Sequence, residues 1–148
     1  MKRLPARSSM NGIDTNILVR FFARDDAVQA KQAEVFLGKR CSPANPGWIS
    51  VIVLCEMVWV LSRGYSYGKD QILPVIDHLM RAPFLKLEDE AAVRTALGIW
   101  ENHALDFSDA LLAVRNQRAG CATTYTFEHK ALAAPGFTRL AQTQGRSC

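Results

Sequence analysis

The chain has 148 residues, of which 49% are hydrophobic and 22% charged, a composition that is ordinary for a globular protein. Lys2, Arg3 and Arg7 supply three of its four net positive charges, so the rest of the chain lacks the footprint of a strong nucleic-acid binder. Its apolar segments are too short to cross a membrane, and no signal peptide is visible, which predicts a cytoplasmic protein with no membrane partner. We expect a disordered extension or tag at 1–9, a single domain at 10–142 and a tail at 143–148.

Hydrophobic periodicity and turn residues predict short strands that alternate with helices. The apolar segment 51–61 is too long for a typical strand, so we predict a helix that is capped by Ser50. Because it is apolar on all faces, we expect it to be covered on all faces, with a sheet on one side and a second subunit on the other. Trp48, Trp59 and Trp100 occupy apolar positions, where core packing is expected. The predicted strands are 12–14, 48–50, 84–87, 121–125 and 137–140, and the predicted helices are 17–22, 25–38, 51–63, 69–80, 88–104 and 110–119.

This alternation predicts an α/β fold, with a parallel sheet of about four to five short strands and helices on both faces. In such sheets, ligands bind beyond the carboxyl ends of the strands. Side chains that follow the strands are therefore the first candidates for a functional site.

Glu56 is the only charged residue between Arg40 and Arg63, and it lies within the apolar helix. A buried carboxylate without a partner costs several kcal/mol, so we expect a cation, a set of donors or a metal beside Glu56. Arg20 and Arg115 are the candidates for an ion pair with it.

Four other acids follow predicted strands or begin a predicted helix. Asp14 follows the first strand, Asp106 and Asp109 surround the start of helix 110–119, and Glu128 follows strand 121–125. We expect all four to lie with Glu56 near the same end of one sheet, where their mutual repulsion favours a bound cation. Mg²⁺ prefers oxygen ligands of this kind, and a metal site of this kind activates water for phosphodiester hydrolysis.

The acids occur within four segments whose order is distinctive. These segments are Asp14-Thr15-Asn16-Ile17-Leu18-Val19-Arg20, then Ser50 with Glu56 six residues later, then Asp106-Phe107-Ser108-Asp109-Ala110-Leu111-Leu112-Ala113, then Thr124-Tyr125-Thr126-Phe127-Glu128. Together they resemble a PIN domain, and in particular the VapC-type ribonuclease toxins of bacterial toxin–antitoxin pairs. The resemblance covers residues 10 to about 140, and it implies a parallel sheet sandwiched by helices.

The resemblance also implies a metal-dependent endoribonuclease with RNA as its substrate. Mg²⁺ or Mn²⁺ would be bound by Asp14, Glu56, Asp106, Asp109 and Glu128, and the Thr15 hydroxyl would help to hold the site. A homodimer is implied, together with a cognate antitoxin protein whose tail lies in the catalytic groove. The family commonly has Asp at the fourth acidic position, where this chain has the longer Glu128.

Each acid also has an ordinary structural interpretation. Asp14 could cap a helix, Asp106 and Asp109 suit a helix N-terminus, and Glu128 alone would be a surface acid. The alternative function is a catalytically weak or inactive PIN-fold interaction module, which the departure at Glu128 keeps open. A phosphoryl-accepting receiver is disfavoured, because it requires paired acids after the first strand and a Lys at a late strand end, and segment 121–125 has no Lys.

Overall fold

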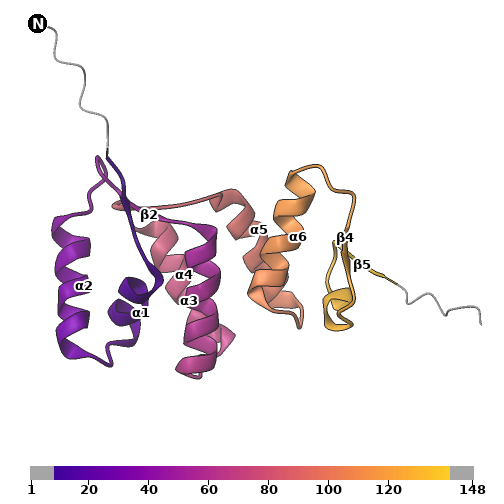
Figure 1. Cartoon of the computed structure of the whole chain (residues 1–148), viewed down its shortest axis with the longest axis horizontal. Coiled ribbons are helices and arrows are strands. Elements are labelled where there is room, and N and C mark those ends of the chain that lie inside the picture. The colour runs from indigo at the N-terminus through magenta and orange to yellow at the C-terminus, as the bar shows by residue number, and fades with distance from the viewer. Residues whose placement is uncertain (1–8, 141–148) are drawn as a thin grey trace, which may run out of the picture. The chain divides into compact units, whose positions relative to one another are not determined.

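The computed structural model describes residues 9–140, which belong to two compact units that divide after Glu90 (Figure 1). The predicted extension, apart from Ser9, and the predicted tail at 143–148 lie outside the described residues. The single domain expected over 10–142 stays a prediction. No helix within 9–140 is both long and apolar enough to span a membrane.

The first unit contains a parallel sheet of three strands in the order β1-β2-β3, as the register of Gly47 with Asn11 and Leu85 shows. Parallel neighbours need long connections, and here each connection consists of two helices. The strands are β1 (Asn11–Gly12), β2 (Gly47–Ile49) and β3 (Leu85–Leu87), and the helices are α1 (Thr15–Ala23), α2 (Ala27–Lys39), α3 (Val51–Gly64) and α4 (Lys69–Arg81).

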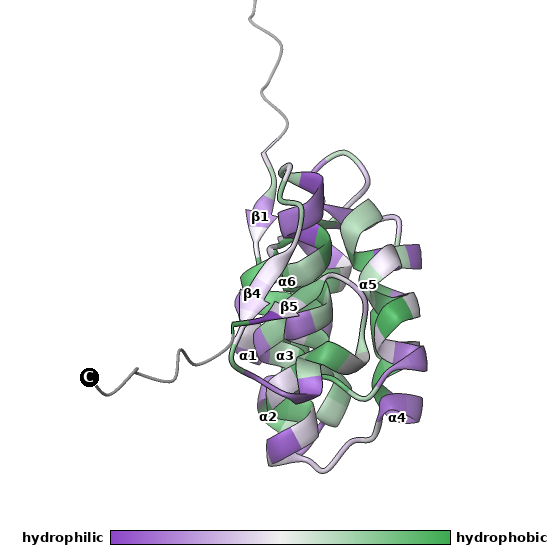
Figure 2. Ribbon diagram, turned by 90° about the vertical axis from the view of Figure 1, so that its right-hand side faces the viewer, coloured by the Kyte–Doolittle hydropathy of each residue, from purple (hydrophilic) through white to green (hydrophobic). Residues whose placement is uncertain are grey.

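Side-chain caps fix where α2 and α3 begin. The carboxylate of Asp26 accepts a hydrogen bond from Gln29 N at 3.0 Å, and Ser50 Oγ accepts one from Val53 N at 3.2 Å. Figure 2 shows hydrophobic and hydrophilic residues alternating along α4, as expected of a helix with one buried face. The largest fully buried side chains of the unit are Leu18, Ile49, Leu54, Met57, Leu61, Ile72, Ile76 and Leu79.

The second unit packs two helices with a parallel pair of strands. Asn116 Nδ2 on the second helix donates to Thr124 Oγ1 at 3.0 Å, which fixes the first strand of the pair beside that helix. The rings of Trp100 and Phe107 meet edge to face, with centroids 5.6 Å apart. The elements are α5 (Glu90–Asn102), α6 (Phe107–Arg118), β4 (Thr124–Thr126), the short 3₁₀ helix η1 (Lys130–Ala133) and β5 (Phe137–Arg139).

The α/β class and the six predicted helices are confirmed, with two differences in the strands. The five strands form a sheet of three and a sheet of two, where a single sheet was expected. The fourth strand begins at Thr124 and not at Cys121, because Gly120 adopts a φ of 106° and Cys121 N donates to Asn116 O at 2.9 Å. These residues continue the turn that ends α6, so they are unavailable to the strand.

Within the single chain, the apolar helix is not covered on all faces, and its coverage by a second subunit stays a prediction. Within α3, Ile52 is 75% exposed and Trp59 is 63% exposed, while Met57 is fully buried. Trp100 lies in the core as expected, and Trp48 is partly buried. One face of α3 therefore carries large apolar side chains at the surface.

Candidate functional site

Asp14 is the N-cap of α1. Its backbone is extended, with φ −83° and ψ 157°, and its Oδ1 accepts a hydrogen bond from Thr15 N at 2.8 Å. The structural interpretation of Asp14 as a helix cap is therefore correct. The cap uses one carboxylate oxygen, and within 9–140 no residue donates to the other. The residue is exposed, so that second oxygen is accessible to a ligand.

Thr15, the first residue of α1, has a polar atom with no partner. The residue is 5% exposed, and its Oγ1 is buried without a hydrogen bond to any described residue. A buried hydroxyl in that state is destabilising until something supplies the missing bond. The Thr15 hydroxyl, to which the resemblance gives a supporting role in the site, therefore has no hydrogen-bond partner among residues 9–140.

Glu56 is exposed, so the inference that this carboxylate is buried is wrong. It follows Ile52 by four residues and precedes Trp59 by three, and all three lie on the exposed face of α3. Its expected ion pair with Arg20 is also wrong, because Arg20 pairs with Asp25 at 3.1 Å.

Asp14, Thr15 and Glu56 line one pocket of about 260 Å³ in the first unit. The start of α1 and the second turn of α3 supply these three side chains. The structure therefore brings together three of the six residues predicted from the sequence. The full lining is Asp14, Thr15, Asn16, Val19, Arg20, Glu56, Val60 and Tyr65.

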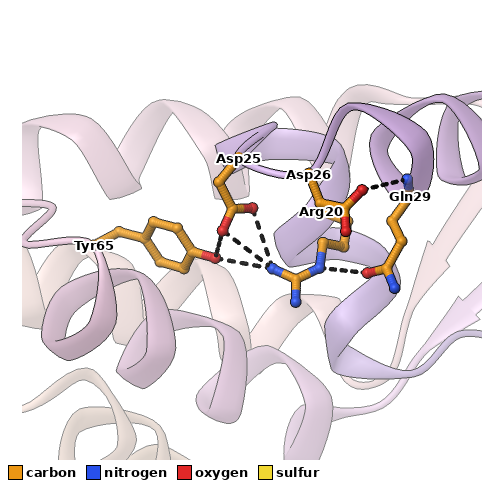
Figure 3. Close-up of polar contacts among 5 residues, drawn as sticks. All are labelled: Arg20, Asp25, Asp26, Gln29 and Tyr65. Carbon is orange, nitrogen blue, oxygen red and sulfur yellow. Dashed lines mark hydrogen bonds and ion pairs between the residues drawn. The ribbon is translucent and has the colours of Figure 1, made fainter.

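Arg20 is held at the wall of this pocket by a polar network (Figure 3). Its Nη1 donates to Asp25 and to the Tyr65 hydroxyl, each at 3.1 Å, and its Nε donates to Gln29 Oε1 at 2.6 Å. The Tyr65 hydroxyl donates in turn to Asp25 Oδ2 at 2.7 Å. That bond lowers the pKa of the Asp25 carboxyl, while the Asp25 charge raises the pKa of Arg20, so both groups are favoured in their charged forms.

The second unit holds the other three acids. Asp106 is the N-cap of α6, yet its side chain makes no cap hydrogen bond, so capping does not explain this carboxylate. Asp109 lies in the first turn and is partly buried. Glu128 follows β4 and is exposed, and its backbone N–H donates to Thr126 Oγ1 at 3.0 Å.

The charges of Asp106 and Glu128 act on the Asp109 carboxyl. Burial raises the pKa of the Asp109 carboxyl, and the charges of Asp106 and then Glu128 raise it further. Like charges in this arrangement disfavour ionisation unless a cation neutralises them. The expectation that these acids lie with Asp14 and Glu56 near the same end of one sheet stays a prediction, because Asp14 and Glu56 belong to the first unit.

The chemistry of both groups fits a hard divalent cation. The donors are carboxylate and hydroxyl oxygens, and the buried Thr15 hydroxyl lacks a partner. No three acidic, His or Cys side chains within 9–140 form a ready metal cage. Mg²⁺ does not need such a cage, because it is usually held by one or two carboxylates, several waters and substrate phosphates.

Comparison with known proteins places this geometry in a family. The family model described as PIN domain matches residues 13–135, a span that contains all six predicted site residues. The chain belongs to the PIN domain family. This PIN domain is 20% identical over 118 residues to a VapC ribonuclease of Aquifex aeolicus (strain VF5), covering 80% of this chain and 87% of that protein. These two matches confirm the resemblance expected from the sequence.

A solved structure is also similar to this PIN domain. It is a crystal structure of VapBC2 from Rickettsia felis bound to a DNA fragment from their promoter, and the matched chain is 19% identical. The match covers 88% of this PIN domain and 97% of that chain, with a TM-score of 0.36.

Three residues of the Arg20 network, Asp25, Gln29 and Tyr65, were not predicted as site residues from the sequence. Asp25 follows Arg20 by five residues and was interpreted only as the start of a helix, while Tyr65 lies just beyond α3. The sequence contains a usable signal for Asp25, since Arg20 and Asp25 flank the end of one helix. Nothing in the sequence connects Tyr65 to them, because 40 residues separate Tyr65 from Asp25.

Proposed function

We propose that this PIN domain is a metal-dependent endoribonuclease and the toxin of a toxin–antitoxin pair. The proposal takes Asp14, Glu56, Asp106, Asp109 and Glu128 as ligands of Mg²⁺ or Mn²⁺, with Thr15 supporting the site. Similarity to a VapC ribonuclease supports the nuclease activity. PIN-domain nucleases generally use divalent metal ions, and this supports the metal dependence.

One observation carries the proposal. Within 9–140, none of the five motif acids forms an ion pair, whereas Asp25, Glu34 and Asp77 are each paired with a cationic side chain. Acids placed at helix starts and a strand end without counter-charges remain available for a cation. In the second unit, burial and then the charges of Asp106 and Glu128 raise the pKa of Asp109, and a bound cation would relieve the repulsion among these charges.

The residues have distinct roles in the proposed reaction. A divalent cation, when bound, polarises the phosphodiester and lowers the pKa of a water molecule. Asp14 presents its free carboxylate oxygen while its other oxygen fixes the start of α1. Asp106 and Asp109 present carboxylates from the N-terminus of α6, and no covalent intermediate with the protein is required.

RNA cleavage by the purified protein tests the proposal. The reaction is run with Mg²⁺, with Mn²⁺ and with EDTA, beside the variants Asp14→Asn and Asp109→Asn. Asn is as good an N-cap as Asp, so Asp14→Asn keeps the start of α1 and removes only the charge. We expect both variants to lose roughly 100-fold or more in rate, as several kcal/mol of charge stabilisation disappears.

The control for these substitutions is Glu101→Gln, an exposed acid of α5 outside the motifs, and its activity should match that of the wild type. Cleavage that persists in EDTA, or in Asp14→Asn, would contradict the catalytic assignment.

Metal binding can be measured separately by thermal unfolding. A cation at 100 times its dissociation constant stabilises a protein by about 2.7 kcal/mol, so Mg²⁺ or Mn²⁺ should raise the melting temperature. Glu56→Gln should remove most of that rise, and Glu101→Gln should not. An equal rise in all three proteins would exclude Glu56 as a ligand.

The alternative is a PIN-fold interaction module that is catalytically weak or inactive. The alternative is favoured by Glu128, which stands where the family commonly has Asp. A longer side chain among the proposed ligands could weaken the metal site. Metal binding without RNA cleavage would support the alternative, whereas Glu128→Asp with unchanged cleavage would show that the longer side chain suffices.

The partners proposed are an RNA substrate, a second copy of the chain and a cognate antitoxin protein. Sedimentation of the purified protein tests the homodimer. Co-purification with the product of an adjacent gene tests the antitoxin, and an antitoxin that binds without reducing cleavage would contradict its proposed role.

A further inference from the structure

Arg20 lines the same pocket as Asp14 and Glu56 but forms an ion pair with neither. An arginine near two unpaired carboxylates would normally bind one of them. Here Asp25 holds the guanidinium instead, and Figure 3 shows Asp25, Gln29 and Tyr65 gathered around it. Arg20 is therefore a fixed positive group in a pocket whose acids stay available.

The Arg20 guanidinium has N–H groups that the polar network does not use. Arg has five N–H groups in a planar fork, and Nε and Nη1 are used by Gln29, Asp25 and Tyr65. Within 9–140, the two N–H groups of Nη2 have no partner. A guanidinium with an open edge is suited to a phosphate, because the donors of its fork match phosphate oxygens.

The surrounding contacts set the orientation of that open edge. Asp25 lies between α1 and α2, Gln29 lies on α2 and Tyr65 follows α3, so three parts of the unit constrain one side chain. Tyr65 donates to Asp25 at 2.7 Å and accepts from Arg20 at 3.1 Å, which links the acceptors to each other. Such a side chain loses little conformational freedom when a ligand binds.

We propose that Arg20 binds a phosphate of the RNA substrate through its Nη2 edge, and that Asp25 and Tyr65 are positioning residues for it. The inference rests on the proposed nuclease function, because RNA supplies the phosphate. A substrate phosphate beside Asp14 and Glu56 would otherwise meet only negative charge from the protein. Arg20 supplies the permanent positive charge that lets the phosphate enter before or with the cation.

Binding of a fluorescein-labelled single-stranded RNA tests the inference without cleavage. Affinity is measured in EDTA over a series of salt concentrations for wild type, Arg20→Ala, Arg20→Lys and Tyr65→Phe. The matched control is Arg24→Ala, which removes the same charge one turn further along but lies outside the pocket, paired with Glu34 at 3.2 Å. Melting temperatures verify that each variant is folded.

We expect Arg20→Ala to weaken binding about tenfold and to lower the salt slope by about 0.7, the value for one phosphate contact to a single strand. Arg20→Lys should restore the slope but only part of the affinity, because Lys lacks the planar fork. Tyr65→Phe should weaken binding less than Arg20→Ala and leave the slope unchanged. Arg24→Ala should lie close to wild type.

The inference is overturned if Arg20→Ala and Arg24→Ala bind RNA equally, whatever their melting temperatures, or if Arg20→Lys and Tyr65→Phe, both folded, match wild type. Its failure is distinguishable from failure of the proposed function. RNA binding that depends on Arg20 without any cleavage would reject the nuclease and keep the phosphate contact. Cleavage with the same KM in Arg20→Ala and Arg24→Ala would keep the nuclease and reject the phosphate contact at Arg20.

Discussion

At the scale of single residues, the candidate site combines groups that are well satisfied with groups that are not. Asp14 caps α1 with one oxygen, whereas the adjacent Thr15 buries a hydroxyl with no partner. Asp106 stands at an N-cap position without making the cap bond. Such local imperfections are expected at functional sites, where groups are kept free for a ligand.

Replacing Thr15 tests whether its hydroxyl destabilises the protein in the absence of metal. Thr15→Val removes an unpaired buried hydroxyl, so we expect stability in EDTA to rise by about 1 kcal/mol. That corresponds to roughly 2–4 °C in melting temperature for a chain of this size. Thr95→Val is the control, and it should lower the stability, because Thr95 Oγ1 donates a hydrogen bond to Ala91 O at 3.2 Å that the valine cannot make. A lower melting temperature for Thr15→Val would show that its hydroxyl is satisfied in solution.

The Asp25 network predicts a pH dependence. The hydrogen bond from Tyr65, followed by the attraction of Arg20, lowers the pKa of Asp25 below its ordinary value of 3.8. A lowered carboxyl pKa contributes stability above the ordinary value, and that stability is lost as pH falls through the folded pKa. Asp25→Asn should therefore be less stable than wild type at pH 7, with the difference shrinking below about pH 3.8. Urea unfolding at several pH values measures this, and a constant difference would contradict it.

At the scale of elements, capping was readable from the sequence and exposure was not. Ser50 was predicted to cap the apolar helix, and α3 does begin at Val51 with Ser50 bonded to Val53 N. Glu56 was predicted to be buried because its neighbours are apolar, yet it lies with Trp59 on an exposed face. An apolar helix without clear periodicity does not reveal which face meets the core.

The cap of α3 gives a prediction about stability. Ser50→Ala should destabilise the protein by about 1 kcal/mol, because Val53 N loses its acceptor. The melting temperature should fall by roughly 2–4 °C. Ser62→Ala, at an exposed position in the same helix, should have little effect. Equal effects of the two substitutions would mean that the cap bond contributes nothing to stability.

The strands were predictable in number and approximate place, but their pairing was not. Residues 121–123 resemble a strand by composition, and the left-handed Gly120 is what delays β4 to Thr124. A division into sheets of three and two strands depends on hydrogen bonds between distant segments, which composition does not encode. Asp14, Asp106, Asp109 and Glu128 were predicted as site residues because they follow strands or lie around a helix start, a feature that survives small errors in register. Their role as ligands stays a prediction.

At the scale of the whole molecule, most of the net positive charge comes from residues 1–8 of the sequence. Lys2, Arg3 and Arg7 carry three of the four net positive charges. Deleting residues 1–8 should weaken binding of single-stranded RNA at low salt and lower the salt slope by up to about 2, at 0.7 for each lost phosphate contact. The cleavage pattern should not change, since the proposed site lies elsewhere. An altered pattern would mean that these residues select the substrate.

The pairing of Arg20 with Asp25 has a consequence for the metal affinity of the proposed site. An arginine released into the pocket would be an internal competitor for Asp14 and Glu56, occupying the carboxylates in place of the cation. If Asp14 and Glu56 bind the cation as proposed, Asp25 would prevent this competition by holding Arg20. Substituting Asp25 would thus be expected to raise the metal concentration required for activity, even though Asp25 is not among the proposed ligands.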